Sequence, residues 1–105
     1  MTGKSRKEQL EAMLRDDPHD PFLHYALAME CVSEGNDEEA IRRFGDLIDR
    51  HPDYPPAYMQ GGQALARLGR PAEAAEWWRR GIEAARRVGD RHAADEMAGL
   101  LQSLP

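Results

Sequence analysis

Four histidines and one cysteine are the side chains of this 105-residue chain that could most readily bind a metal or act as a nucleophile. Metal sites need ligands at short, regular spacings, and a cysteine nucleophile needs a histidine within reach. The histidines share no such spacing, and Cys31 lies on the apolar face of an expected helix without a histidine partner. We therefore expect no catalytic residue, no metal or cofactor site and no enzymatic activity. The four histidines are His19, His24, His51 and His92.

A run of three acids, Asp37-Glu38-Glu39, is the other candidate, because neighbouring carboxylates can perform general acid–base catalysis. The run follows Asn36, a favourable N-cap residue, and acids in a first helical turn are stabilised by the positive end of the helix. We interpret the run as the start of a helix. The sequence also contains no G-x-x-x-x-G-K, H-E-x-x-H or G-x-S-x-G motif.

The net charge of the chain is -5, which argues against broad nucleic-acid binding. The charge is unevenly placed, since residues 16–54 hold 11 acids and 3 bases, whereas residues 67–91 hold 7 bases and 4 acids. Two solvated helix faces would explain this difference, and so would a charge gradient that orients a partner.

The chain shows no signal for secretion or for insertion into a membrane. Its first residues, M-T-G-K-S-R-K-E, lead into no apolar segment of the kind a signal peptide has, and no apolar run is long enough to span a bilayer. A single cysteine excludes a disulfide within the chain. We expect a cytoplasmic protein.

Helix start and stop signals divide the chain into six expected helices and no strand. Asp20 before Pro21 is an N-cap followed by proline at the first helical position, and Gly35 is a C-cap candidate. Ser5 with Glu8 forms a capping-box pattern. The expected helices cover residues 5–18, 20–34, 36–51, 56–68, 71–87 and 91–103.

The apolar pattern repeats at one fixed interval along the chain. Gly35 returns as Gly69, Phe44 as Trp78, and the pairs Ala40/Ala74 and Ile48/Ile82 have the same spacing. A fixed period of roughly 34 residues is typical of a helical solenoid, in which stacked helix pairs bury a continuous core. The first helix matches the second half of a repeat. Its Leu10, Met13, Leu14 and Pro18 correspond to Phe44, Leu47, Ile48 and Pro52.

The repeated positions resemble the tetratricopeptide repeat family, whose pattern is W-x2-L-G-x2-Y, then A-x3-F, then P. The small residues let paired helices approach closely, and we expect Phe44 and Trp78 to fill the space between pairs. The second unit departs from the pattern at Gly61, Gly81 and Arg86, and the last helix has Glu96 where a small residue is expected. The matching residues are Leu27, Ala28, Cys31, Gly35, Ala40, Phe44 and Pro52 in the first unit, and Tyr58, Gly62, Leu65, Gly69, Ala74 and Trp78 in the second.

The resemblance implies an all-α fold, a right-handed α-solenoid of antiparallel helix pairs forming one domain over residues 1–105. Its expected parts are a leading helix (5–18), two repeats (20–53 and 54–88) and a capping helix (90–104). His24 and His92, which are separated by twice the period, would then be equivalent positions at the edge of the core. Trp77 is expected to pack against neighbouring side chains, although a contact with a partner is the alternative.

The resemblance also implies a function, because the first helix of each pair lines a concave groove in this family. We expect an adaptor or scaffold that binds a peptide or helix of another protein, of unknown identity, there. The alternative is that the short superhelix closes on itself and buries much of this surface. The expected groove residues are Phe22, Tyr25, Met29, Val32, Met59, Gln63 and Met97. Some relatives bind acidic C-terminal peptides through a Lys/Asn clamp, and the clamp residues are missing here.

A function of a different class is self-association. The last helix carries more apolar residues than one packing face needs, and exposed apolar patches often mark interfaces. Leu101 with Ala94 is the part of that stripe expected to lack a partner in the same chain. A weak homodimer through this helix is therefore the alternative hypothesis, and a monomer with the stripe folded over the core is its counterpart.

Overall fold

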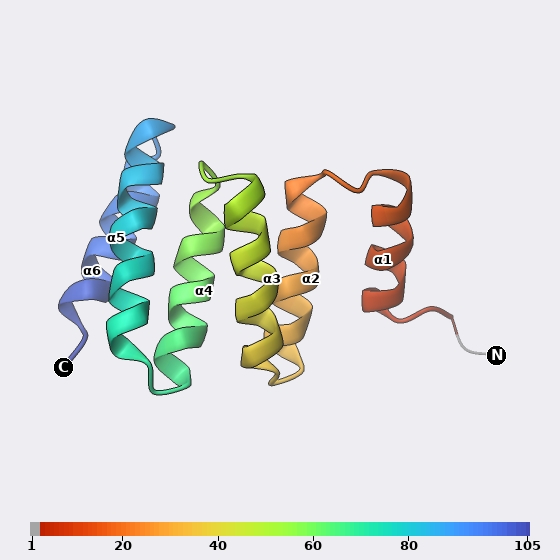
Figure 1. Ribbon diagram of the computed structural model, residues 1–105, viewed down its shortest axis with the longest axis horizontal. Helices are drawn as coiled ribbons and strands as arrows, with labels where there is room; N and C mark the ends of the chain where they lie inside the picture. The colour runs from red at the N-terminus through yellow and green to blue at the C-terminus, as the bar shows by residue number, and fades with distance from the viewer. Residues whose placement is uncertain (1–2) are drawn as a thin grey trace.

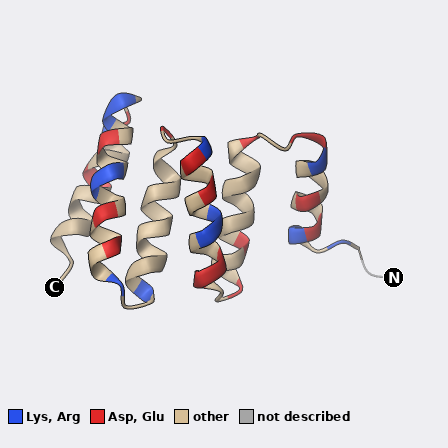
Figure 2. Ribbon diagram, in the orientation of Figure 1, with Lys and Arg blue, Asp and Glu red and all other residues tan. Residues whose placement is uncertain are grey.

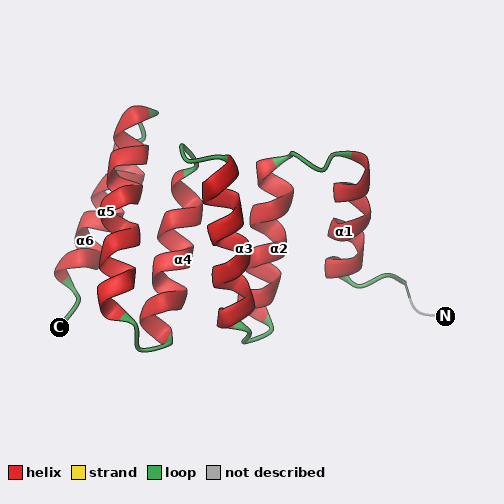
Figure 3. Cartoon of the chain, in the orientation of Figure 1, coloured by secondary structure: helices red, strands yellow, loops and turns green. Residues whose placement is uncertain are grey.

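The computed structural model describes residues 3–105, and within them all regular structure is α-helical (Figures 1 and 3). This confirms the predicted all-α solenoid, and the helix bounds differ from those expected by one or two residues at most ends. The six helices are α1 (Arg6–Asp16), α2 (Pro21–Ser33), α3 (Asp37–Arg50), α4 (Pro55–Arg67), α5 (Pro71–Arg87) and α6 (Arg91–Gln102).

The helices stand in a row about 48 Å long, and each contacts the next along the chain (Figure 1). Among helices that are two apart in the chain, α4 contacts both α2 and α6, and these contacts lie on one side of the row. The backbones of α1, α3 and α5 stay further apart. We call α2, α4 and α6 the inner layer, because helices that converge in this way form the concave side of a curved array.

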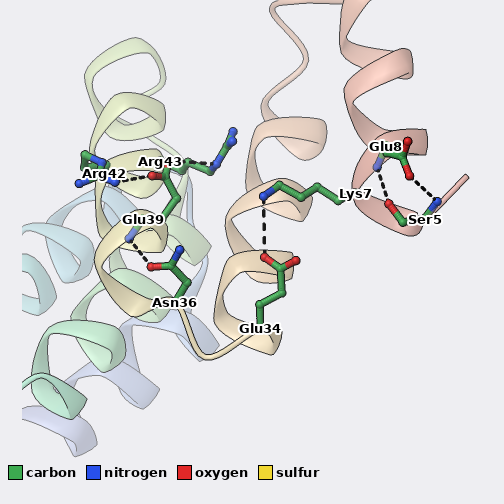
Figure 4. Close-up of polar contacts among 8 residues, drawn as sticks. All are labelled: Ser5, Lys7, Glu8, Glu34, Asn36, Glu39, Arg42 and Arg43. Carbon is green, nitrogen blue, oxygen red and sulfur yellow. Dashed lines mark hydrogen bonds and ion pairs between the residues drawn. The ribbon is translucent and has the colours of Figure 1, made fainter.

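Side-chain caps begin four of the helices where the sequence predicted them. Ser5 and Glu8 form a reciprocal capping box with two hydrogen bonds of 3.1 Å (Figure 4). Asp20 accepts a hydrogen bond from the Phe22 amide at 2.9 Å, and Asp90 caps α6 in the same manner. Asn36 accepts from the Glu39 amide at 3.2 Å, so the acidic run lies in the first turn of α3, as interpreted. These bonds satisfy amides that a helix start leaves without partners.

Three glycines close α2, α4 and α5 with the same turn. Gly35, Gly69 and Gly89 have φ angles of 77°, 75° and 75°, a left-handed conformation that disfavours any side chain. In each turn the following amide donates back to a carbonyl five residues earlier, as in Asn36 to Cys31 at 2.8 Å. This is the Schellman arrangement, and it directs the chain into the next antiparallel helix.

The tightest packing joins α4 to α5, where two glycines of α4 face two tryptophans of α5. A Cβ atom built on Gly61 would lie 2.2 Å from the Trp77 ring, and one built on Gly62 would lie 2.3 Å from the indole nitrogen of Trp78. The Trp78 indole N–H also donates to the Met59 carbonyl at 3.2 Å. The predicted packing role of Trp77 is thus confirmed, and both rings lie against the backbone of α4.

Phe44 and Trp78 occupy matching repeat positions but fill different spaces. Phe44 contacts the Tyr25 ring of its own pair, and its Cβ also lies against Gly61 of the next pair. It is therefore the predicted wedge between pairs. Trp78 instead packs on Gly62 within its own pair, because the missing side chain there leaves space for the larger indole ring.

The second unit is longer than the first, and this changes the alignment of α6. Pro52 follows shortly after the 14-residue α3, whereas Arg86 takes that place in the 17-residue α5. Proline cannot continue a helix, and without it α5 runs on to the turn at Gly89. One period separates the start of α2 at Pro21 from that of α4 at Pro55. The start of α6 at Arg91 comes two positions later than one further period would place it.

This offset corrects two predictions for α6. With the longer spacing between equivalent positions, Ala98 takes the small-residue place of Gly62, and Glu96 does not. His92 aligns with Pro56 and Phe22 and is exposed, so it is not equivalent to His24. Burial follows the new alignment, since Ala93, Ala94 and Met97 are buried like their counterparts in α4. The last helix is therefore built as the first helix of a repeat.

The N-terminal edge is packed more loosely. Leu10 is the only buried residue of α1, and it belongs to a small apolar cluster with Leu23, Ala26 and Leu27 of α2. Lys7 reaches across to Glu34 at 3.8 Å, which is a long and exposed ion pair (Figure 4). The helix α1 touches no other helix than α2.

Candidate protein-binding groove

The residues considered for catalysis are placed apart or buried in the structure. Cys31 is a buried free thiol in the core, and the His24 ring nitrogen lies 2.7 Å from the Pro18 carbonyl oxygen. Among residues 3–105, no three His, Cys, Asp or Glu side chains gather closely enough to hold a metal ion. None of the six helices is both long and apolar enough to cross a membrane.

The inner layer brings six of the seven predicted groove residues together on two neighbouring helices. Phe22, Tyr25, Met29 and Val32 recur at helical spacing on α2, and Met59 and Gln63 do so on α4. Phe22 is 59% exposed, and the other five are partly buried. Since α2 and α4 are in contact, these side chains border one continuous surface.

Aromatic rings form the floor of this surface. The Tyr25 ring lies 6.0 Å from that of Phe44 and 5.8 Å from that of Tyr54, both in tilted arrangements. Burial, and secondarily the neighbouring Tyr54, raises the pKa of Tyr25. Burial likewise raises the pKa of Tyr54, with a smaller contribution from Asp20. Both hydroxyls are therefore neutral at physiological pH and can donate or accept a hydrogen bond beside the apolar side chains.

The inner helices carry very little charge. Glu30 is the single charged residue of α2 and Arg67 that of α4. Both are paired away from the groove, Glu30 with Arg6 at 3.4 Å, and Arg67 with Asp37 through hydrogen bonds of 2.9 and 3.0 Å. Figure 2 shows charges concentrated on α1, α3 and α5, while α2 and α4 are almost uniformly uncharged. The inner face of α2 and α4 thus presents no unpaired charge that an apolar segment would have to bury.

The seventh predicted groove residue, Met97, is placed elsewhere. It is fully buried, and its sulfur lies against Gly81 of α5. The two-residue offset explains this, because Met97 aligns with the core positions Leu27 and Gly61. The positions of α6 that align with Tyr25, Met29 and Val32 are all exposed, and they are Asp95, Gly99 and Gln102.

The exposed side of the inner layer therefore changes in character along its length, from aromatic and methionine side chains on α2 to polar and acidic ones on α6. The repeat pattern did not predict Tyr54 or the three residues of α6 as part of this surface. A signal for the α6 residues was present, because the cap-to-cap distance from Tyr54 to Asp90 exceeds the period by two positions. Tyr54 stands in a link between helices and has no periodic signal.

No protein-family model and no curated protein matches the chain. Solved structures do match. A tetratricopeptide repeat domain protein from Salinibacter ruber is 34% identical, with 79% of this chain and 92% of that chain covered and a TM-score of 0.74.

Two further structures show the same fold at 15% identity. The translocator chaperone SycD of the Yersinia enterocolitica type III secretion system covers 93% of this chain and 74% of its own, with a TM-score of 0.86. PcrH, in complex with the chaperone binding region of PopD, covers 92% and 74% with a TM-score of 0.84.

The repeated residues and the paired helices thus agree with the fold of the Salinibacter ruber protein, which is 34% identical to this chain over 92% of its own length. The chain belongs to the tetratricopeptide repeat family.

Proposed function

We propose that the protein is a non-catalytic adaptor that binds a segment of another protein in the groove of the inner layer. The observation that carries this proposal is the uncharged surface of α2 and α4, where aromatic and methionine side chains remain partly exposed. A surface of this composition is favoured when an apolar partner covers it.

The side chains suit an adaptable site for a peptide or helix. Methionine has flexible, polarisable side chains that adjust to differently shaped apolar groups, and Met29 and Met59 lie on adjacent helices. Tyr25 and Tyr54 supply neutral hydroxyls for hydrogen bonds with a peptide backbone. An amphipathic helix in an apolar groove is a common mode of recognition that uses such surfaces.

The polar end of the groove limits the orientation of the bound segment. Asp95 is exposed on α6 and aligns with Tyr25 and Met59. A partner with apolar residues toward α2 and a basic residue toward α6 fits this arrangement best. The complex of PcrH with a region of PopD supports the proposal, because in that complex a protein of this fold binds a segment of another protein.

The proposal is tested by capturing partners from native lysate with the wild type and with Met29→Glu and Met59→Glu, identifying them by mass spectrometry. The matched control is Val88→Glu, which places the same charge on an exposed apolar residue just after α5, outside the groove. We expect both groove variants to lose a partner that the wild type and the control retain, at least tenfold by quantitative mass spectrometry. Circular dichroism checks that all variants keep their helicity.

Retention of every wild-type partner by both groove variants would contradict the proposal. Equal loss from the groove variants and from Val88→Glu would also contradict it, because the binding surface would then not be the inner layer.

A further inference from the structure

The helix α6 has the faces of a first repeat helix, but within residues 3–105 no second helix covers it. In the first two units, α3 and α5 cover the face formed by Ala28 in α2 and Gly62 in α4. The aligned position in α6 is Ala98, flanked one turn away on either side by Ala94 and Leu101. Ala98 and Leu101 are only partly buried. Ala94 is 8% exposed and belongs to the core, so the expectation that it lacks a partner in the same chain is wrong.

A pocket of about 480 Å³ lies on this uncovered face. It extends from the end of α5 along the first two turns of α6, and its small alanine side chains leave room for larger ones from outside. The residues that line it are Arg86, Gly89, Arg91, Ala94, Asp95 and Ala98.

The opposite end of the array carries the complementary element. The helix α1 has the pattern of a second repeat helix, and within the described residues no first helix precedes it. Met13 aligns with Leu47, which is 1% exposed, yet Met13 itself is 52% exposed. The side of α1 that faces a partner in a complete unit is therefore uncovered.

We propose that α1 of a second copy docks on the uncovered face of α6 and completes a repeat between the two molecules. This is a head-to-tail contact between different surfaces, and it differs from the symmetric dimer considered above. Its pocket shares Asp95 with the polar end of the inner layer. The second copy is the occupant that α6 fits, because α1 has the pattern of the second repeat helix that α6 lacks within residues 3–105.

The first unit shows the helix spacing that the proposed contact needs. In the second unit a Cβ atom on Gly81 would lie 2.6 Å from the Tyr58 Cβ, so this pair is too close for side chains on both helices. The aligned residues of the first unit, His24 and Leu47, both carry side chains and line one pocket, and the aligned pair across the proposed contact is Ala94 and Met13. Met13 of one copy would enter the pocket beside Ala94 and Ala98 of the other.

Charges are complementary as well. The two helices of a unit are antiparallel, as seen where Arg87 at the end of α5 reaches Asp53 before the start of α4. Docked in the same way, the end of α1 with Asp16 and Asp17 would lie near Arg91 at the start of α6 and Arg86 at the end of α5, which line the pocket together with one acid, Asp95. The basic start of α1 would lie near the last turn of α6, where helix carbonyls favour a cation.

A contact between two different surfaces does not end at a dimer, because each added copy exposes a new α6 face. The weight-average mass should therefore rise with concentration beyond twice the monomer mass of 11.9 kDa. Sedimentation equilibrium of the wild type over a wide concentration range measures this rise. A constant mass would overturn the proposal, and it would assign the α6 face to a different protein or to further chain.

Two variants locate the contact. Ala98→Glu places a charge in the pocket, and Met13→Glu does so on α1 of the other surface; both positions are outside the buried core, and circular dichroism checks the fold. Each variant alone should remain a monomer. Val88→Glu, at an exposed apolar residue just after α5 that does not line the pocket, is the control and should associate like the wild type.

Mixing the two variants decides between head-to-tail and symmetric association. The Ala98→Glu copy keeps an intact α1 and the Met13→Glu copy an intact α6, so the mixture should form a 1:1 heterodimer that grows no further. A symmetric dimer through α6 would instead leave Met13→Glu dimeric by itself. That result, or a mixture that stays monomeric while the wild type associates, would overturn the proposal.

Discussion

The contact between α4 and α5 and the contact between α1 and α2 join helices of the same solenoid by different means. In the α4–α5 contact, Gly61 and Gly62 bring the backbone of α4 against two tryptophan rings. In the α1–α2 contact, Leu10 is the one buried residue that α1 contributes, and exposed ion pairs supplement it. The second unit is consequently the tightly packed part of the array, and α1 is its loosely held edge.

The difference shows how one repeat pattern can serve both stability and recognition. Close helix approach requires small residues on one helix and large ones on its neighbour, and the α4–α5 pair satisfies both conditions. The α1–α2 pair joins two different units, and there Leu10 packs against Leu23, Ala26 and Leu27 of α2. Met13 lies on the side of α1 that no first helix covers within residues 3–105, and it therefore remains accessible at the edge.

Trp78→Ala should have the largest effect on stability. The substitution removes a buried indole from the α4–α5 contact together with its hydrogen bond to the Met59 carbonyl. Truncation of a core aromatic lowers the free energy of unfolding by about 3–5 kcal/mol. Urea denaturation followed by circular dichroism measures the change, and an unaltered midpoint would show that the α4–α5 contact does not stabilise the fold.

Leu10→Ala should weaken the edge by about 2 kcal/mol, the lower end of the range for a buried leucine, because the loosely packed site can relax. Since α1 contacts α2 alone, the effect should be local. Hydrogen exchange should accelerate roughly 30-fold for amides of α1 and remain unchanged in α4 and α5. Equal acceleration in all helices would show that the two regions unfold together.

Gly61→Ala should destabilise the protein by about 1 kcal/mol, although alanine is the better helix former. The added methyl group would meet the Trp77 ring at 2.2 Å, and the strain of overpacking exceeds the gain in helix propensity. Gly99→Ala is the control, because nothing lies near its Cβ position, and it should stabilise the protein by about 0.5–1 kcal/mol. A stabilising Gly61→Ala would mean that the α4–α5 contact is not tightly packed.

Asp37→Asn should have the smallest effect, a loss of about 0.5 kcal/mol at pH 7, because the ion pair with Arg67 is partly exposed. The Arg67 hydrogen bonds lower the pKa of Asp37. The stabilisation is therefore complete above the pKa of the unfolded chain, about 3.9, and is lost as pH falls through the lower folded pKa.

Denaturation at pH 7 and near pH 3 measures this difference between wild type and Asp37→Asn, which should shrink at the lower pH. Glu38→Gln, another acid in the first turn of α3, controls for the helix dipole. If Glu38→Gln has the same effect as Asp37→Asn, the ion pair contributes nothing.

Local signals in the sequence predicted most of this architecture. Ser5, Asp20 and Asn36 are caps whose hydrogen bonds involve only nearby amides, and Gly35 and Gly69 mark turns that need a left-handed residue. Such features depend on a few adjacent residues, so a single sequence contains them in full.

The position of α6 depends on something less local. A helix without a proline stop continues until the next turn residue, and the replacement of Pro52 by Arg86 allowed α5 three more residues than α3. The assumption of a constant period hid this insertion and placed Met97 in the groove. Tyr54 was not predicted for another reason, since its place beside Tyr25 arises only when α4 packs against α2.

The central claim, that the inner layer binds the partner, can be tested directly through the methionines. Carbon-13 labelling of the methionine methyl groups gives separate NMR signals for Met29 and Met59 in the groove, Met97 in the core and Met13 on α1. Addition of a captured partner, at a protein concentration where the chain is monomeric, should shift the Met29 and Met59 signals and leave the Met13 signal in place. A titration that saturates while Met29 and Met59 do not move would contradict the account.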